Sequence, residues 1–115
     1  MGERGIHMAF DFQAAFSTAL NAGFTAAKPG GKAAEDWIRE SANANKKTLS
    51  SIADGFVTKQ ISKETAEILL GESRSALESE AAALSVIIKA TAQAAVNAFL
   101  GSLFTALKSA LKLAL

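Results

Sequence analysis

The last third of the chain constrains the fold most strongly. From Ala81 to Leu115, 24 of 35 residues are apolar and none is acidic. The charged residues of this segment are Lys89, Lys108 and Lys112. A long amphipathic stretch must cover its apolar side, either with the rest of the chain or with another surface. The sequence therefore predicts a long C-terminal helical segment that packs against something.

The amino-acid composition favours an all-α fold. Half of the residues are hydrophobic, and this share is made mainly of alanine and leucine, with one proline and no tyrosine. Alanine and leucine favour helices, whereas strands are rich in β-branched and aromatic residues. A length of 115 residues fits one domain. We expect a small antiparallel bundle of three or four helices with a long C-terminal helical segment.

Residues 1–7 are interpreted as a cloning remnant, because the pair His7-Met8 matches a restriction site that is often placed at start codons. The expected single helical domain is then 8–115, and it contains neither histidine nor cysteine. Residues 9–20 carry no basic leader and include polar side chains, so no secretory signal is expected there. We expect a cytoplasmic protein, with peripheral membrane attachment as the alternative.

The first predicted helix covers about residues 11–27. Asp11 is a suitable N-cap, because its carboxylate accepts hydrogen bonds from backbone N–H groups of the first turn. The helical pattern ends at Pro29, Gly30 and Gly31, residues that stop a helix. Apolar residues recur at spacings of three and four: Phe12, Ala15, Phe16, Ala19, Leu20 and Phe24.

The second predicted helix covers about residues 32–57. Its apolar positions alternate steps of four and three, as in a heptad: Ile38, Ala42, Asn45, Leu49, Ile52 and Phe56. Asn45 falls in the middle of this apolar seam. A buried asparagine can specify the register or the partner in a helical assembly, which makes Asn45 a candidate specificity position. A seam that ends in solvent at this point explains the residue equally well.

The third helical stretch begins at Ser62, a favourable N-cap. Glu64 and Glu67 follow in the first turns, where the helix dipole favours negative charge. This start is the best-defined boundary in the sequence.

This third stretch is too long to be one helix of a compact domain. A helix from Ser62 to Leu115 would have 54 residues and a length of about 80 Å. We therefore expect a break near Gly101, with helices over about 62–100 and 102–114. A continuous helix that projects into an oligomer is the alternative.

The final segment is predicted to be strongly amphipathic. Residues 106–115 are similar to designed membrane-active peptides built from lysine, leucine and alanine, which implies binding to a bilayer interface. The same apolar face would also close a helical bundle, with the lysines suited to a helix C-terminus. The predicted interaction face consists of Ile88, Ala95, Phe99, Leu103, Ala106, Leu107, Ala110 and Leu111.

A transmembrane interpretation rests on the 18 uncharged residues of 90–107, about the minimum spanning length. Five polar side chains disfavour an isolated span, although a helical oligomer that inserts together would tolerate them. They are Thr91, Gln93, Asn97, Ser102 and Thr105.

The sequence carries no recognisable catalytic, metal-binding or cofactor-binding pattern. Without a native histidine, serine or threonine nucleophiles lack their usual base. Twelve basic residues against 11 acidic ones, with Lys46-Lys47 as the densest basic cluster, do not indicate nucleic-acid binding. We therefore expect no enzyme, no cofactor and no small-molecule substrate. The predicted function is helix-mediated association with a protein partner or with itself, and the alternative is membrane-surface binding through residues 81–115.

Overall fold

The computed structural model describes the backbone of residues 11–114 and their side chains except at 86, 87 and 110–114. This part of the chain is helical throughout, apart from short turns, and contains no strand. The predicted all-α bundle with a long C-terminal helix is confirmed. The elements are α2 (Phe12–Ala27), the short 3-10 helix η1 (Lys28–Gly30), α3 (Gly31–Ala44), α4 (Lys46–Val57), α5 (Lys63–Ala81) and α6 (Val86–Ala114).

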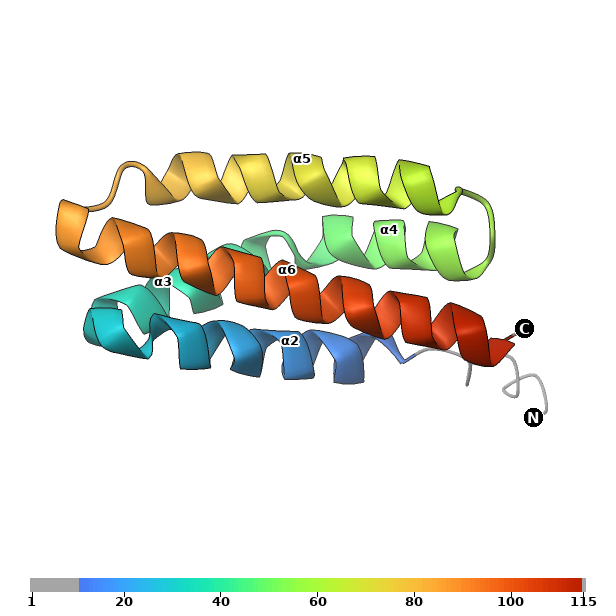
Figure 1. Cartoon of the computed structure of the whole chain (residues 1–115), viewed down its shortest axis with the longest axis horizontal. Helices are drawn as coiled ribbons and strands as arrows, with labels where there is room; N and C mark the ends of the chain where they lie inside the picture. The colour runs from blue at the N-terminus through green and yellow to red at the C-terminus, as the bar shows by residue number, and fades with distance from the viewer. Residues whose placement is uncertain (1–10, 115) are drawn as a thin grey trace.

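Helix α6 is the central element of the bundle. It runs along the molecule between α2 and α5, and α3 and α4 cross behind it (Figure 1). It contacts each of the other α-helices in the described chain. The molecule is elongated, with principal extents of 49 × 25 × 20 Å. Its length is set by α6, because 29 residues of α-helix span about 44 Å.

Helix α2 begins as the sequence predicts. The carboxylate of Asp11 accepts a hydrogen bond from the backbone N–H of Ala14 at 3.1 Å, which confirms the N-cap. The helix ends at Ala27, and Pro29 then stands within the 3-10 turn η1. Gly31 has φ of +77°, a left-handed conformation that glycine adopts without steric cost.

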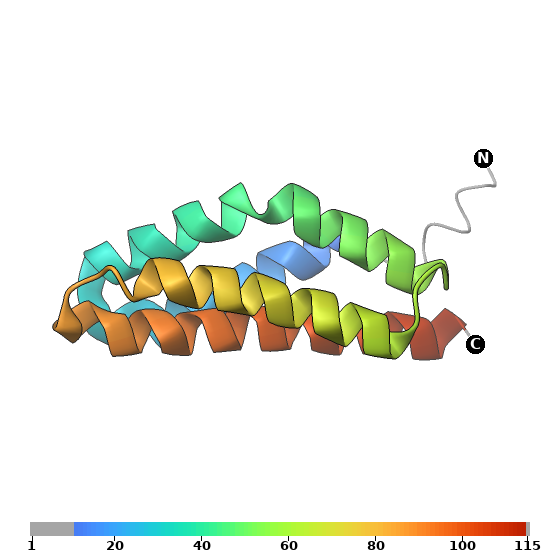
Figure 2. The same ribbon diagram turned by 90° about the horizontal axis from the view of Figure 1, so that it is seen from above.

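The single helix predicted over 32–57 is divided at Asn45, which separates α3 from α4. The backbone of Asn45 leaves helical geometry at φ −100° and ψ 2°. Its side-chain Nδ2 donates to the carbonyl oxygen of Ser41 at 2.9 Å. Local side-chain hydrogen bonds of this kind compete with the helix ladder. The resulting bend is visible in Figure 2, where α3 and α4 form an arch beside α5 and α6.

Helix α5 begins at the predicted N-cap. The hydroxyl of Ser62 accepts a hydrogen bond from the backbone N–H of Thr65 at 3.1 Å, and Glu64 lies in the first turn. Near the other end of α5, buried Ser41 donates to Glu80 Oε1 at 3.2 Å and links α3 to α5. A buried hydroxyl is thereby satisfied.

The break predicted near Gly101 lies elsewhere, in the turn of residues 82–85. There the backbone N–H of Leu84 bonds to the carbonyl of Ala81 at 2.9 Å, and Lys89 N–H bonds to Ser85 at 2.8 Å. Reversal at this turn allows the apolar sides of α5 and α6 to face each other. Gly101 lies on the exposed side of α6, where a glycine costs only about 1 kcal/mol relative to alanine. That cost is too small to end a helix held by packing along its length.

The core extends along the whole bundle and is centred on α6. Its largest fully buried side chains are Phe56, Phe99, Ile38, Leu49, Leu77, Leu103, Leu107 and Val96. Every helix from α3 to α6 contributes at least one of them, and Phe16 of α2 packs into the same cluster.

Candidate functional site

The predicted interaction face of the C-terminal segment lies inside the fold. Four of its residues, Ala95, Phe99, Leu103 and Leu107, have no exposed area. Ile88 and Ala106 are half-buried. This face packs against the chain's own helices, so the surface open to a partner is a different one. The remaining two residues, Ala110 and Leu111, have side chains outside the described part of the structure.

Asn45, the candidate specificity position, lies at the junction of α3 and α4 and is half-buried. Its side-chain amide donates to the carbonyl oxygen of Ser41 in α3. The structure thus gives Asn45 a local role at the bend between α3 and α4.

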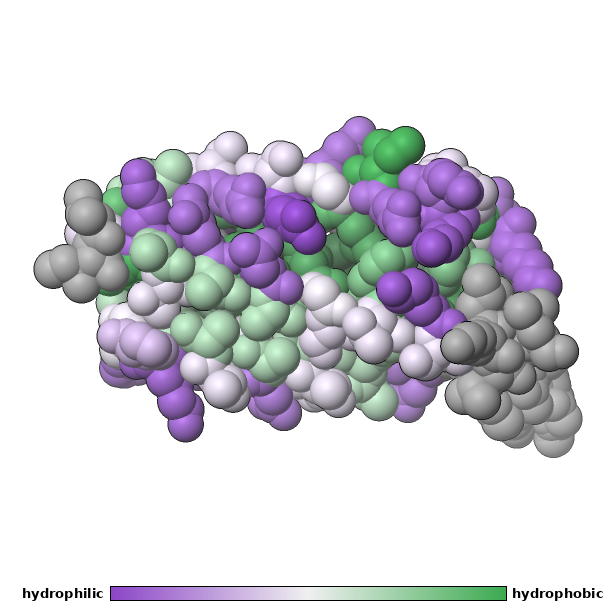
Figure 3. All heavy atoms as spheres, in the orientation of Figure 1, coloured by the Kyte–Doolittle hydropathy of each residue, from purple (hydrophilic) through white to green (hydrophobic). Residues whose placement is uncertain are grey.

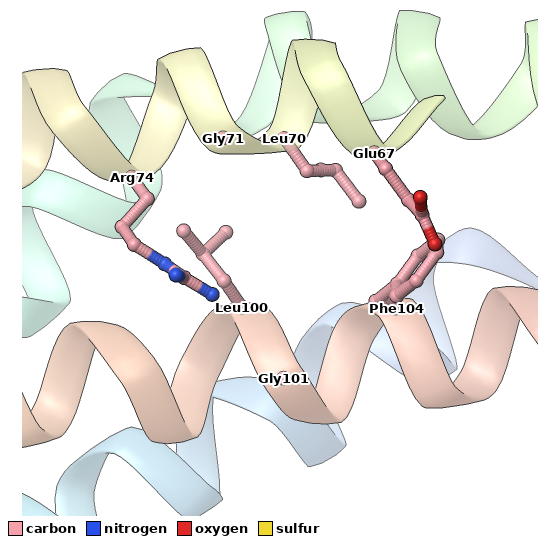
Figure 4. A pocket seen from close by; sticks show the side chains of 7 residues that line it. All are labelled: Glu67, Leu70, Gly71, Arg74, Leu100, Gly101 and Phe104. Carbon is pink, nitrogen blue, oxygen red and sulfur yellow. The ribbon is translucent and has the colours of Figure 1, made fainter. Parts of the chain in front are cut away.

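A groove of about 200 Å³ lies between α5 and α6 (Figure 4). It opens on the face that Figure 3 shows, where apolar atoms form the bottom of a hollow edged by hydrophilic side chains. The residues that line the groove are Glu67, Leu70, Gly71 and Arg74 of α5, and Leu100, Gly101 and Phe104 of α6.

Two glycines create the groove. A Cβ atom built on Gly71 or on Gly101 would meet nothing within 4 Å. The space that larger side chains would fill is therefore open along both helices. Leu70 and Leu100 are buried and form the apolar floor, which Phe104 extends at one end.

The two charged residues of the groove stand at opposite ends. Figure 4 shows Glu67 and Arg74 reaching from α5 toward α6, with Gly71 between them along the helix. Glu67 has an ion pair with Lys63 at 4.0 Å, a marginal distance between two largely exposed side chains. Within residues 11–114, Arg74 forms no ion pair.

Beside the groove, the outer face of α6 consists of small, uncharged residues. Between Lys89 and Lys108 no residue of α6 is charged. The residues of this outer face, spaced three or four apart and exposed, are Ala90, Ala94, Asn97, Gly101 and Thr105. The groove and this face form one continuous open surface, because Gly101 belongs to both.

Sequence reasoning missed this groove. It placed a helix break near Gly101 and assigned Glu67 to the first turns of a helix, where the dipole favours negative charge. The signal that was available is the alternation of charge around Gly71 on one side of α5, since Glu67 and Arg74 are four and three residues from it. The position of Gly101 opposite Gly71 depends on the reversal at residues 82–85, whereas the predicted break lay near Gly101.

Helix α6 also contains a segment with the properties of a membrane span. Residues 88–109 are long and apolar enough to cross a bilayer, by length and composition alone. In the bundle, 39% of this apolar segment is buried. The core helix of a water-soluble bundle satisfies the same criterion, so this observation gives weak support to membrane insertion.

Hydrogen bonds from Lys32 and then from Arg39 hold the pKa of the Asp36 carboxyl below its usual value. In the part of the chain that the structure describes, no group of three or more histidine, aspartate or glutamate residues is placed to hold a metal ion.

Compared with protein-family models, with curated proteins and with solved structures, the chain gives no match in any of the three.

Proposed function

We propose that the protein is a non-enzymatic association module whose contact surface is the groove between α5 and α6 together with the outer face of α6. The observation that carries the proposal is the open apolar floor between Gly71 and Gly101, edged by two charges of opposite sign. Glycines let another chain approach closely, and the charged edge supplies specificity.

The chemistry of the groove supports association over catalysis. Its lining includes no serine, threonine, cysteine, histidine or lysine, which are the usual nucleophiles and bases. Its two polar side chains, Glu67 and Arg74, stand at opposite ends with glycine and leucine between them. An acid and a base that act together need to reach the same reacting atom. Opposite charges at the ends of an apolar floor suit recognition of a complementary surface.

Membrane-surface binding is the second candidate, and the apolar segment of α6 is the observation that favours it. Lipid contact through the C-terminal apolar face would require Phe99, Leu103 and Leu107 to leave the core, where they have no exposed area. Such an opening would unfold much of the bundle, because α6 contacts each of the other α-helices described. A groove that is already open needs no comparable rearrangement.

Light scattering of the purified protein, with and without vesicles that contain anionic lipid, tests the two candidates. A discrete protein assembly that vesicles leave unchanged supports the association module. A monomer that binds vesicles would overturn it in favour of the membrane role. The variant Gly71→Glu provides the control, because it places a charge in the groove at a position where an added Cβ atom meets nothing within 4 Å. It should abolish assembly while the far-UV circular dichroism stays helical.

A further inference from the structure

We propose that the partner in the groove is a second copy of this chain, related by a two-fold axis so that the two α5 helices run antiparallel and cross near Gly71. This inference rests on the proposed association function and names its partner. It is carried by the pattern of charges along the groove side of α5.

Four charged residues and one glycine lie on this side of α5. At 100° per residue they fall within an arc of about 80°, and three of them line the groove directly. In chain order their charges are positive, negative, none, positive and negative. The residues are Lys63, Glu67, Gly71, Arg74 and Glu78.

This order of charges is complementary to its own reverse. When two α5 helices run antiparallel and cross near Gly71, Glu67 of each copy lies opposite Arg74 of the other. Lys63 of each copy likewise lies opposite Glu78 of the other. A two-fold axis makes every such pair occur twice, as an isologous interface requires. A parallel arrangement in register would instead place like charges opposite each other, which is unfavourable.

The state of these side chains in the single chain agrees with the proposal. Arg74 has no ion pair within the described residues. Glu67 has only the marginal contact with Lys63 at 4.0 Å, and its side chain remains 48% exposed. Both groups are therefore free to pair across an interface. The aliphatic part of Arg74 from the second copy would also cover the apolar floor near Phe104.

The same two-fold axis brings small residues of α6 together. Because Gly71 and Gly101 lie on facing sides of the groove, an axis near Gly71 also passes close to Gly101. The outer faces of the two α6 helices then meet through Ala94, Asn97 and Thr105, which carry no charge. Small residues permit a close approach of helices and add packing contacts to the ion pairs.

A different protein would not need this pattern, because its own charges can match the groove whatever their order along α5. A second copy has the same charges as the first, so the order along α5 must be complementary to itself when it is read in the opposite direction. The arrangement of opposite charges about Gly71 meets this stricter requirement, so it favours a second copy.

Sedimentation equilibrium of the full chain and of charge-reversed variants tests the proposal. Each of Glu67→Arg and Arg74→Glu places like charges opposite each other twice, and each should raise the dimer dissociation constant by about tenfold or more. An equimolar mixture of these two variants should form a heterodimer, because both contacts are then attractive again. The double variant, with both substitutions in one chain, should recover self-association for the same reason.

The variant Glu72→Arg is the matched control. Glu72 is exposed on the outer side of α5, away from the groove, and its reversal changes the net charge as much as Glu67→Arg does. It should leave the dimer unchanged, and thermal melts should show that every variant folds. Raising the salt concentration should weaken the dimer of the unmodified chain, because exposed ion pairs are screened.

Two results would overturn the proposal. If the unmodified chain stays monomeric in the absence of lipid, the second copy is not the partner. If it associates but the mixture of charge variants gains nothing over either variant alone, association occurs through another geometry. In the second case the proposed association function stands, whereas a monomer that binds anionic vesicles contradicts both proposals.

Discussion

The ring of Phe99 on α6 meets the ring of Phe16 on α2 edge to face, with centroids 5.5 Å apart and planes at 88°. Both residues are buried, at 0% and 3% exposure. Edge-to-face geometry is one of the favourable arrangements of two aromatic rings. This contact joins the first described helix to the last, so it closes the bundle.

Replacement of Phe99 by alanine should lower the free energy of unfolding by about 3–5 kcal/mol, because it removes a buried ring and leaves a cavity. Urea unfolding followed by circular dichroism measures the effect. The control is Ile68→Ala, since Ile68 is 61% exposed and its truncation should change stability by less than about 0.5 kcal/mol. Equal effects of the two substitutions would contradict the position of Phe99 in the core.

Replacement by alanine should change the free energy of unfolding in opposite directions at two glycines of the bundle. A Cβ atom on Gly23 would lie 3.2 Å from Cγ1 of Ile38 and 3.4 Å from the carbonyl oxygen of Ala95, whereas one on Gly101 would meet nothing within 4 Å. We expect Gly101→Ala to raise the free energy of unfolding by about 0.5–1 kcal/mol through helix propensity alone. Gly23→Ala should lower it by about 1 kcal/mol or more, because helix packing is too close there. Urea unfolding at low protein concentration separates these effects from association.

The helix starts could be predicted because their determinants are local. Asp11 and Ser62 each accept a hydrogen bond from a backbone N–H three residues later, and this chemistry depends on residue type and spacing alone. The all-α class follows similarly from composition. These features need no knowledge of which helix packs against which.

The break between α5 and α6 depended on tertiary packing, and the prediction that placed it near Gly101 is wrong. The turn of residues 82–85 contains neither glycine nor proline, and it forms because the apolar sides of α5 and α6 can be buried against each other only after a reversal. The break was predicted near Gly101 because glycine disfavours a helix, yet Gly101 lies within α6 on its exposed side. The groove followed from this same reversal, so it could not be located before the turn was known.

Lys59 is the one non-glycine residue with positive φ in the described chain, at +64°. It ends α4 in a Schellman-type turn, in which Gln60 N–H bonds to the carbonyl of Gly55 at 2.8 Å and Lys59 N–H bonds to Phe56 at 3.1 Å. A left-handed conformation is costly for residues with a Cβ atom. Lys59→Gly should therefore raise the free energy of unfolding by about 0.5–1 kcal/mol. Lys59→Ala removes the same charge and keeps the strain, so a similar gain in both variants by calorimetry would contradict the argument.

The cluster around Asp36 should make a small, pH-dependent contribution to stability. Lys32 Nζ donates to its carboxylate at 3.1 Å and Arg39 Nη1 at 2.9 Å, and these bonds lower its pKa. Because the folded pKa lies below the unfolded value, the stabilisation is present above about pH 4 and is lost as pH falls through the folded pKa. The difference in Tm between the unmodified chain and Asp36→Asn should thus shrink between about pH 6 and about pH 2. A difference that grows on acidification would contradict this assignment.

A substitution at Asn45 distinguishes a local role at the end of α3 from a role in assembly. Its Nδ2 bonds to the carbonyl of Ser41 at 2.9 Å and its backbone N–H bonds to Ala42 at 3.1 Å, so its polar groups are used at the end of α3. Asn45→Ala should change the free energy of unfolding by about 1 kcal/mol or less. Sedimentation equilibrium should show the same mass distribution as for the unmodified chain, because Asn45 does not line the groove. A changed oligomeric state would instead show that Asn45 specifies the register of an assembly, as buried asparagines do in coiled coils.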